Sequence, residues 1–285
     1  MKKVIASLSA LLLFLSVMPP LTSLAEDYQP SHYIEKNKSR YEAFEAKNPK
    51  IPYNEMLAYV NANVDKGFYN GVVTVRNPSS TTILVNKNFV LPTGYEPGDL
   101  VTFLGGHRLR REAARQLVKM RDDMLSLGYR MTVIATYRSF GTQTNSYNNA
   151  VARFGVANAE VSFARPGHSE HQTGLAVDLL HVGGFDYMQN SGFEKTKEFT
   201  WLQENAYRYG FILRYPDGYR DIHGFIFEPW HWRYVGVAAA TAMHIRGIAL
   251  LEEYYGQYLA PGVLTKKFLR ADSPPQLGRY TVQIA

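Results

Sequence analysis

The sequence predicts an α+β fold, and three observations lead to this prediction. Segments rich in Val, Ile and Thr alternate with segments whose apolar residues recur every three or four positions, as strands and helices require. The predicted strands are short, and some of them are joined by tight turns. This pattern favours an α+β arrangement over a doubly wound parallel sheet.

The first elements of the alternating region are two strands at residues 70–76 and 81–86, which a turn cluster at 77–79 separates. Residues 110–127 predict a helix, because their apolar positions recur at three- and four-residue steps and Gly128 follows as a C-terminal cap. A strand and a second helix are expected after it, at residues 131–136 and 142–154.

The second half of this region repeats the alternation. Residues 174–180 predict a strand, and residues 197–209 predict a helix that Gly210 ends. Residues 222–228 predict another strand, and residues 234–255 predict a final helix.

The composition excludes several classes of protein. The 285 residues are 46% apolar and 20% charged, which is ordinary for a globular chain and excludes disordered acidic chains, collagen and coiled coils. Lys and Arg number 31 against 25 Asp and Glu, so the net charge of +6 is only mildly basic. We therefore expect no nucleic-acid partner, whereas an anionic polymer such as a cell wall would suit this charge.

The absence of cysteine excludes more than any other number. With no Cys in the sequence, the chain has no disulfide, no cysteine nucleophile, no thiolate-bound zinc and no lipid-anchor cysteine. Any metal site must be built from His, Asp and Glu.

Residues 1–25 resemble a secretory signal peptide. Lys2 and Lys3 precede an apolar stretch at 4–18, and small residues at 23 and 25 predict cleavage after Ala25. The alternative is an uncleaved membrane anchor, but Pro19-Pro20 ends the stretch short of the roughly 20 apolar residues that a spanning helix needs. We expect an exported protein without a stable membrane span, located in a periplasm, at a cell wall or in the medium.

The segments that flank the alternating region differ from it in composition. Residues 26–54 are polar and contain three prolines, which predicts an N-terminal arm or linker. Residues 256–285 contain three prolines and show no sustained helical period, which predicts a C-terminal extension. Residues 55–255 are therefore the expected folded domain.

Two short segments contain the candidate metal ligands. His171 and Asp178 lie in SEHQTGLAVD, and His231 lies in EPWHWRYVG. Asp178 shares a strand face with Ala176, and an inward-facing Asp in an apolar strand is costly unless it is paired or binds a metal. A buried Asp satisfied by backbone amides or by an arginine is the alternative, and the spacing leaves it open.

Three features favour the metal. Glu228 lies three residues before His231, and Pro229 forces extended backbone at Glu228. Two imidazoles and one carboxylate leave the fourth tetrahedral position open for water, as in catalytic zinc sites. Glu228, which is not one of the ligands, is then close enough to take a proton from that water.

Three motifs carry a resemblance to a known family: YRSFGTQ (137–143), ARPGHSEHQTGLAVDL (164–179) and EPWHWRYVG (228–236). Together they closely resemble the VanY-type D-alanyl-D-alanine carboxypeptidases, which are related to the D-Ala-D-Ala dipeptidases and the hedgehog domain. The upstream stretch at 84–101 is similar to that family's entry segment. The resemblance implies a single zinc peptidase domain at 55–255, with a small antiparallel sheet flanked by helices.

The resemblance also implies roles for individual residues. One zinc ion would be bound by His171, Asp178 and His231. Glu228 would be the general base and later the acid, and Arg138 would stabilise the charge on the scissile carbonyl oxygen. Two further residues would hydrogen-bond the peptide substrate: Ser169 and Gln143. The alternatives are that Ser169 caps local backbone and that Gln143 is a surface helix residue.

The implied function is an exported zinc metallopeptidase that removes the C-terminal D-alanine from peptidoglycan stem peptides. Its partners would be those stem peptides. An L,D-carboxypeptidase acting on tetrapeptide stems is the first alternative, because the metal chemistry is the same. A non-catalytic wall-binding module is the second, although both Glu228 and Arg138 are present. Serine-type peptidases with the same activity need Ser-x-x-Lys, which does not occur in the sequence, and the Gly-x-Ser-x-Gly elbow is also absent.

Three residues near the ligands have less specific predictions. His168 is expected to be a solvent-facing loop residue rather than an additional ligand. Trp230 and Trp232 flank His231, and they either pack in the core around the metal or form a wall of the substrate pocket.

Overall fold

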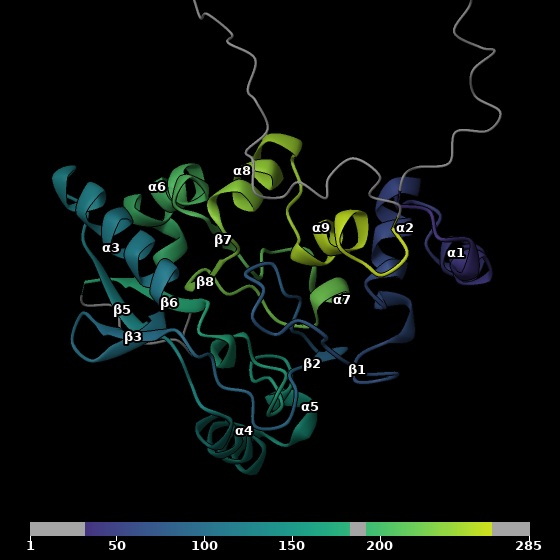
Figure 1. Ribbon diagram of the computed structural model, residues 1–285, viewed down its shortest axis with the longest axis horizontal. Helices are drawn as coiled ribbons and strands as arrows, with labels where there is room; N and C mark the ends of the chain where they lie inside the picture. The colour runs from purple at the N-terminus through teal and green to yellow at the C-terminus, as the bar shows by residue number, and fades with distance from the viewer. Residues whose placement is uncertain (1–31, 183–191, 264–285) are drawn as a thin grey trace, which may run out of the picture. The chain divides into compact units, whose positions relative to one another are not determined.

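The computed structural model describes residues 32–182 and 192–263, and it confirms the predicted α+β class (Figure 1). The signal segment at 1–25 and most of the predicted C-terminal extension lie outside the described residues. Among the helices that are described, none is both long and apolar enough to cross a bilayer.

The central feature is a four-stranded antiparallel sheet with the order β5-β6-β8-β7. Its strands are β5 (Met131–Ala135), β6 (Ala176–His181), β7 (Phe211–Leu213) and β8 (His231–Tyr234). All residues of β6 except the last are buried, because β6 pairs with a strand on each side and its apolar residues contribute to the main core. The predicted strands at 131–136 and 174–180 are thereby confirmed within two residues.

Two helices cover this sheet through one apolar core (Figure 1). They are α3 (Arg111–Ser126) and α6 (Lys197–Asn205). Leu117, Met120 and Met124 of α3 recur at the predicted spacing and are fully buried. The predicted helix at 197–209 is α6 followed by a 3-10 turn, η6 (Ala206–Tyr209), which ends at Gly210 with φ 84°.

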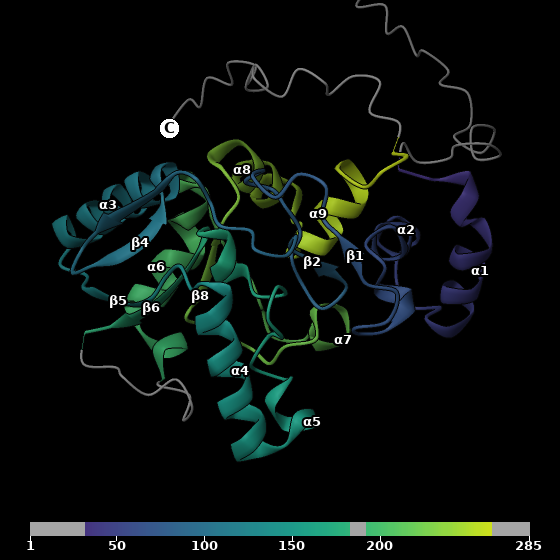
Figure 2. The same ribbon diagram turned by 60° about the horizontal axis from the view of Figure 1, so that its bottom comes forward.

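The predicted helix at 142–154 begins two residues earlier, as α4 (Phe140–Phe154). Ser139 is its N-cap, and the Ser139 side chain accepts a hydrogen bond from the Thr142 amide. A short helix, α5 (Val156–Ala159), follows after Gly155. Figure 2 shows α4 and α5 side by side.

Two of the strand predictions are wrong. Residues 81–86 form no strand, and the stretch at 70–76 contributes only β1 (Val73–Thr74), which pairs in parallel with β2 (Phe89–Val90). Residues 222–228 form the end of α7 (Arg220–His223) and then irregular chain, because Gly224 takes a left-handed φ of 85° that ends the helix. The sequence patterns also missed the hairpin of β3 (Leu100–Phe103) and β4 (His107–Arg110).

The single final helix expected at 234–255 is also wrong. Tyr234 is the last residue of β8, and α8 (Val237–Arg246) ends at Gly247, whose φ is 67°. A second helix, α9 (Leu251–Tyr258), then continues past the predicted boundary at 255.

Part of the segment at 26–54, which the sequence suggested was an arm or linker, is helical in the structure. It contains η2 (Glu35–Asn37) and α1 (Lys38–Lys47), and Tyr41 of α1 is buried with α2 (Tyr53–Asn61). In turn, α2 lies against α9 in both views (Figure 1, Figure 2). A Cβ added at Gly256 would lie 2.0 Å from the Ala58 carbonyl oxygen, so glycine is what allows this close approach.

Three further short 3-10 helices occur in the described chain: η3 (Val64–Lys66), η4 (Glu170–Thr173) and η5 (Phe193–Lys195). Of these, η4 matters for the site, because it contains His171 and leads directly into β6.

Candidate metal centre and active site

The three predicted metal ligands come together in the structure. Asp178 of β6 is the register partner of His231 of β8, so strand pairing alone places their side chains side by side. His171 lies in η4, and Gly174 with φ 66° turns the chain from η4 toward β6. One ligand atom from each residue lies within 4.8 Å of the others, and all three residues are buried.

The two histidines direct different ring nitrogens toward the Asp178 carboxylate, His171 its Nε2 and His231 its Nδ1. His171 Nδ1 lies 2.7 Å from the Thr136 carbonyl oxygen and donates to it, which leaves Nε2 facing Asp178 Oδ2 at 3.4 Å. His231 Nε2 lies 3.4 Å from Glu170 Oε2, which leaves Nδ1 facing Asp178 Oδ1 at 3.2 Å. His171 Nε2 and His231 Nδ1 therefore face the same carboxylate, and they are the ring nitrogens that would bind a metal there.

The donor atoms fit a bound divalent cation. Among the described residues, His171 Nε2 and Asp178 Oδ1 are buried side-chain atoms without a hydrogen-bond partner. An unpaired buried polar group costs about 1–3 kcal/mol, and coordination to a metal would remove that cost. Two imidazole nitrogens and one carboxylate oxygen are a common ligand set of catalytic zinc.

The charges of the ligands follow from their surroundings. Burial lowers the pKa of His171 to about 4, so this imidazole is neutral. Burial also acts to lower the pKa of His231, but Asp178 and Glu170 outweigh it and raise that pKa to about 9. Against the effect of burial, the two imidazoles hold the pKa of Asp178 well below its usual range. The carboxylate is therefore ionised, as a metal ligand must be.

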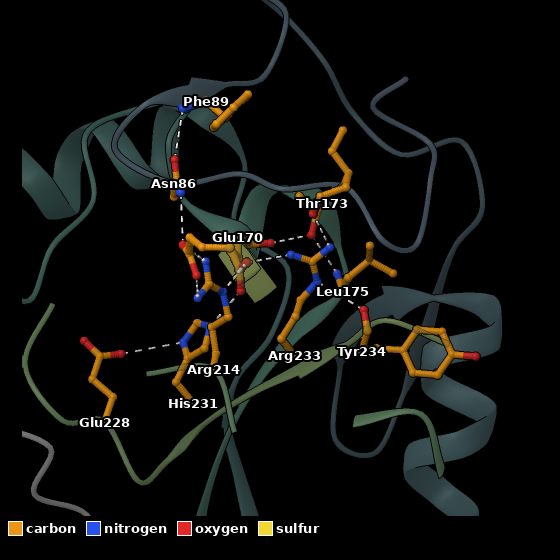
Figure 3. Close-up of polar contacts among 12 residues, drawn as sticks. Asn86, Phe89, Glu170, Thr173, Leu175, Arg214, Glu228, His231, Arg233 and Tyr234 are labelled. Carbon is orange, nitrogen blue, oxygen red and sulfur yellow. Dashed lines mark hydrogen bonds and ion pairs between the residues drawn. The ribbon is translucent and has the colours of Figure 1, made fainter. Parts of the chain in front are cut away.

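Glu228 lies at the edge of the ligand group. The tight turn from Glu228 to His231 is closed by a 3.1 Å hydrogen bond from the His231 amide to the Glu228 carbonyl oxygen. This turn places Glu228 Oε2 3.8 Å from His231 Nδ1 (Figure 3). Burial raises the pKa of Glu228 to about 8, which favours a carboxyl that can hold a proton during a reaction.

Arg138 and Gln143 form a pair beside the ligands. The Arg138 amide donates to the His171 carbonyl oxygen at 3.2 Å, which ties the start of α4 to η4. Arg138 Nη1 donates to Gln143 Oε1 at 3.2 Å, and Gln143 Nε2 donates to the Ala164 carbonyl oxygen at 2.8 Å. Gln143 is 1% exposed, so it is no surface helix residue. Among the described residues, the buried Arg138 Nε has no hydrogen-bond partner, and Arg138 lines the cavity described below.

Ser169 precedes η4 as its N-cap residue, but its side chain makes no capping hydrogen bond. The alternative that Ser169 only caps local backbone is therefore not supported. Its side chain lines the cavity described next, as substrate binding would require.

A cavity of about 420 Å³ opens over the site, and all seven predicted site residues line it. Most of the other lining residues are apolar or aromatic: Phe163, Ala164, Tyr215, Phe225, Ile226 and Trp230. The two tryptophans therefore divide the two expected roles between them. Trp230 lines the cavity, and Trp232 is 1% exposed and packs in the core.

Glu170 is not among the predicted site residues, yet it is 1% exposed and contacts His231. A signal for it was present in the sequence, because a Glu next to a metal-ligating His in a buried segment needs a charged partner.

The expectation that His168 faces solvent is wrong. His168 is buried, its Nδ1 lies 2.8 Å from the Asn86 carbonyl oxygen, and its ring meets the edge of Tyr69. It is not part of the ligand group.

Comparison with known proteins agrees with this geometry. Residues 106–237 match the family model described as VanY, D-alanyl-D-alanine carboxypeptidase. The putative carboxypeptidase YodJ of Bacillus subtilis is 40% identical over 195 residues, which are 65% of this chain and 70% of that protein.

Two solved structures share the fold. The LdcB LD-carboxypeptidase superposes with a TM-score of 0.60 at 39% identity, over 66% of this chain and 91% of LdcB. A mutant of the vancomycin resistance D,D-pentapeptidase VanY in complex with Zn(II) gives 0.53 at 37% identity, over 61% of this chain and 98% of that one. With the family model, the YodJ relative and a zinc-bound VanY in agreement, the chain belongs to the VanY D-alanyl-D-alanine carboxypeptidase family and is a zinc carboxypeptidase.

Proposed function

We propose that this chain removes the C-terminal D-alanine from peptidoglycan stem peptides, with zinc held by His171, Asp178 and His231. The observation that carries the proposal is the buried ligand group itself, whose unpaired His171 Nε2 and Asp178 Oδ1 lie beside Glu228 in one cavity. The family match and the zinc-bound VanY structure support the same assignment.

The residues of this chain then divide the reaction among them. Bound zinc would supply Lewis-acid chemistry, which polarises the scissile carbonyl and makes water more acidic. Glu228 takes a proton from the attacking water and later delivers it to the leaving amine of D-alanine. Arg138, held by Gln143, stabilises the negative charge that develops on the carbonyl oxygen. Ser169 hydrogen-bonds the bound peptide.

The cavity is suited to a short peptide end. Its volume of about 420 Å³ is within the roughly 300–1,000 Å³ of typical ligand pockets. Its apolar lining residues would contact the methyl group of alanine, while Arg138 and Ser169 would fix the orientation of the peptide.

Cleavage of the D-Ala-D-Ala bond of pentapeptide stems is our first assignment, because the family model bears that name. Cleavage of an L-residue–D-alanine bond in tetrapeptide stems is the second candidate. The specific observation in its favour is the LdcB LD-carboxypeptidase, which superposes with a TM-score of 0.60, against 0.53 for the zinc-bound VanY.

We also propose that the enzyme acts outside the cytoplasm, after cleavage behind Ala25. The charged, apolar and small-residue pattern of residues 1–25 supports export. The catalytic domain predicted at 55–255 would be extended on both sides, by α1, which packs on α2, and by the end of α9.

The test is to incubate residues 26–285 with purified stem tetrapeptide and pentapeptide, with and without a chelator, and to identify the products by mass spectrometry. Loss of one alanine from the pentapeptide, abolished by the chelator and restored by zinc, is the expected result. Loss from the tetrapeptide alone would establish the second candidate. No loss from either peptide would contradict both and favour a wall-binding module.

A further inference from the structure

Glu170 lies directly before the predicted ligand His171, yet its carboxylate faces the other histidine. Its side chain is fully buried. Glu170 Oε1 accepts hydrogen bonds from Arg214 Nε at 2.8 Å and from Arg233 Nη1 at 2.6 Å. Glu170 Oε2 lies 3.4 Å from His231 Nε2. One carboxylate thus connects two arginines to a metal-ligand candidate (Figure 3).

The two arginines also form hydrogen bonds to groups other than Glu170. Arg214 donates to both carboxylate oxygens of Glu252 at 2.9 and 2.7 Å, and Asn86 Nδ2 donates to Glu252 at 3.0 Å. Arg233 Nη2 donates to the carbonyl oxygens of Thr81 and Ile83 at 3.0 and 2.7 Å. We call Asn86, Glu170, Arg214, Arg233 and Glu252 the buried ion network.

This arrangement fixes the orientation of the Glu170 carboxylate. Its Oε1 is used by two charged donors, so only Oε2 is directed at His231. A carboxylate flanked by two guanidinium groups stays ionised and can only accept a hydrogen bond. In the neutral, metal-binding form of His231, Nε2 therefore carries the proton, and the lone pair of the ring is left on Nδ1, which faces Asp178.

We propose that Glu170 is a positioning residue that fixes the tautomer and the ring orientation of His231, so that His231 Nδ1 is ready to bind the metal. The inference rests on the metal site proposed above and adds the residue that prepares it. Glu170 touches neither substrate nor metal in this assignment, and acts through His231 alone.

The sharpest test is Glu170→Gln, which keeps the shape of the side chain. Both arginines are donors, so they would hold the amide oxygen of the new side chain, and its NH₂ group would face His231 Nε2. His231 Nε2 would then have to accept a hydrogen bond from this NH₂ group. The ring proton would move to Nδ1, the nitrogen that is proposed to bind the metal. Zinc affinity, measured by competition with a chromophoric chelator, should fall about 10- to 100-fold.

The matched control is Glu252→Gln, which removes the same charge from the same network. Glu252 contacts Arg214 and Asn86 but not His231, so its loss should lower the thermal midpoint while zinc affinity stays within about threefold of wild type. Glu112→Gln, a partly exposed residue of α3, controls for a change of charge alone.

A second readout does not depend on activity or on the stability of a variant. In the zinc-loaded wild-type protein, long-range ¹⁵N–¹H NMR should find His231 protonated at Nε2. A proton at Nδ1 would overturn the proposal, as would unchanged zinc affinity in Glu170→Gln. If Glu170→Gln and Glu252→Gln lose zinc affinity equally, the effect is structural and the positioning role is wrong. Failure of the wild type to bind zinc would instead refute the metal site itself.

Discussion

Two groups of charged side chains, most of them buried, lie next to each other in this molecule, and they differ in how their polar atoms are paired. The metal-site cluster consists of the buried His171, Asp178, Glu228 and His231 and the half-buried Arg138. Among the described residues, one side-chain atom in each of Arg138, His171 and Asp178 is buried without a hydrogen-bond partner, and Glu228 contacts His231 only at 3.8 Å. In the buried ion network, each charged side chain has a partner at 2.6–3.0 Å. The two groups meet at the contact of Glu170 with His231.

This difference in pairing predicts different effects on stability and on activity. When a buried charge is fully paired, removal of one partner leaves the other buried and uncompensated, and this destabilises the folded protein. Polar atoms that are buried without a partner reduce stability unless a ligand completes them. We therefore expect variants of the metal-site cluster to lose activity with little change in stability, and variants of the network to lose stability first.

The largest effect is expected for Glu228→Gln. The amide cannot take a proton from water, so kcat should fall by about 10²–10⁴-fold while zinc affinity and the thermal midpoint stay near wild type. Single-turnover hydrolysis of the stem peptide would measure the loss. A kcat within threefold of wild type would refute the assignment of the base.

The next largest effect is a loss of stability when Arg214 of the buried ion network is replaced. Arg214→Met leaves Glu170 and Glu252 buried with fewer partners, and should lower the free energy of unfolding by about 3–5 kcal/mol. Urea denaturation followed by tryptophan fluorescence would measure it. The control is Arg115→Met, whose ion pair with Glu112 is exposed and whose midpoint should not move. Equal midpoints for the two variants would show that the network contributes no stability.

Arg138→Ala tests the unpaired guanidinium nitrogen. Loss of one donor to a developing oxyanion costs about 10²–10³-fold in kcat, and we expect a decrease in this range with unchanged zinc affinity. Gln143→Leu should reproduce part of this decrease, because Gln143 holds Arg138 in place. If Gln143→Leu raises KM alone, Gln143 binds substrate directly, as the family resemblance implied.

The smallest effect is expected for Ser169→Ala. A single neutral hydrogen bond is worth about 0.5–1.5 kcal/mol, so KM should rise by about two- to tenfold with little change in kcat. Steady-state kinetics on the preferred stem peptide would measure both KM and kcat. An unchanged KM would mean that Ser169 lines the cavity without binding the peptide.

Local patterns predicted some elements well and failed at others for identifiable reasons. The helix at α3 and the strands β5 and β6 were predicted because each has a sustained period and a clear boundary. The strand predicted at 222–228 failed because its apolar residues line a cavity instead of pairing in a sheet. The last helix was predicted as one because its apolar residues continue across Gly247, where the backbone turns left-handed.

The sequence by itself determined the chemistry of the site. The residue types, their spacing within three motifs and the absence of cysteine left an imidazole and carboxylate metal site as the expectation. Only the tertiary structure decided which atoms face the metal position, because the pairing of β6 with β8 and the Thr136 and Glu170 contacts join residues far apart in the chain. The role of Glu170 was invisible for the same reason: its partners, Arg214 and Arg233, approach it only when the sheet forms.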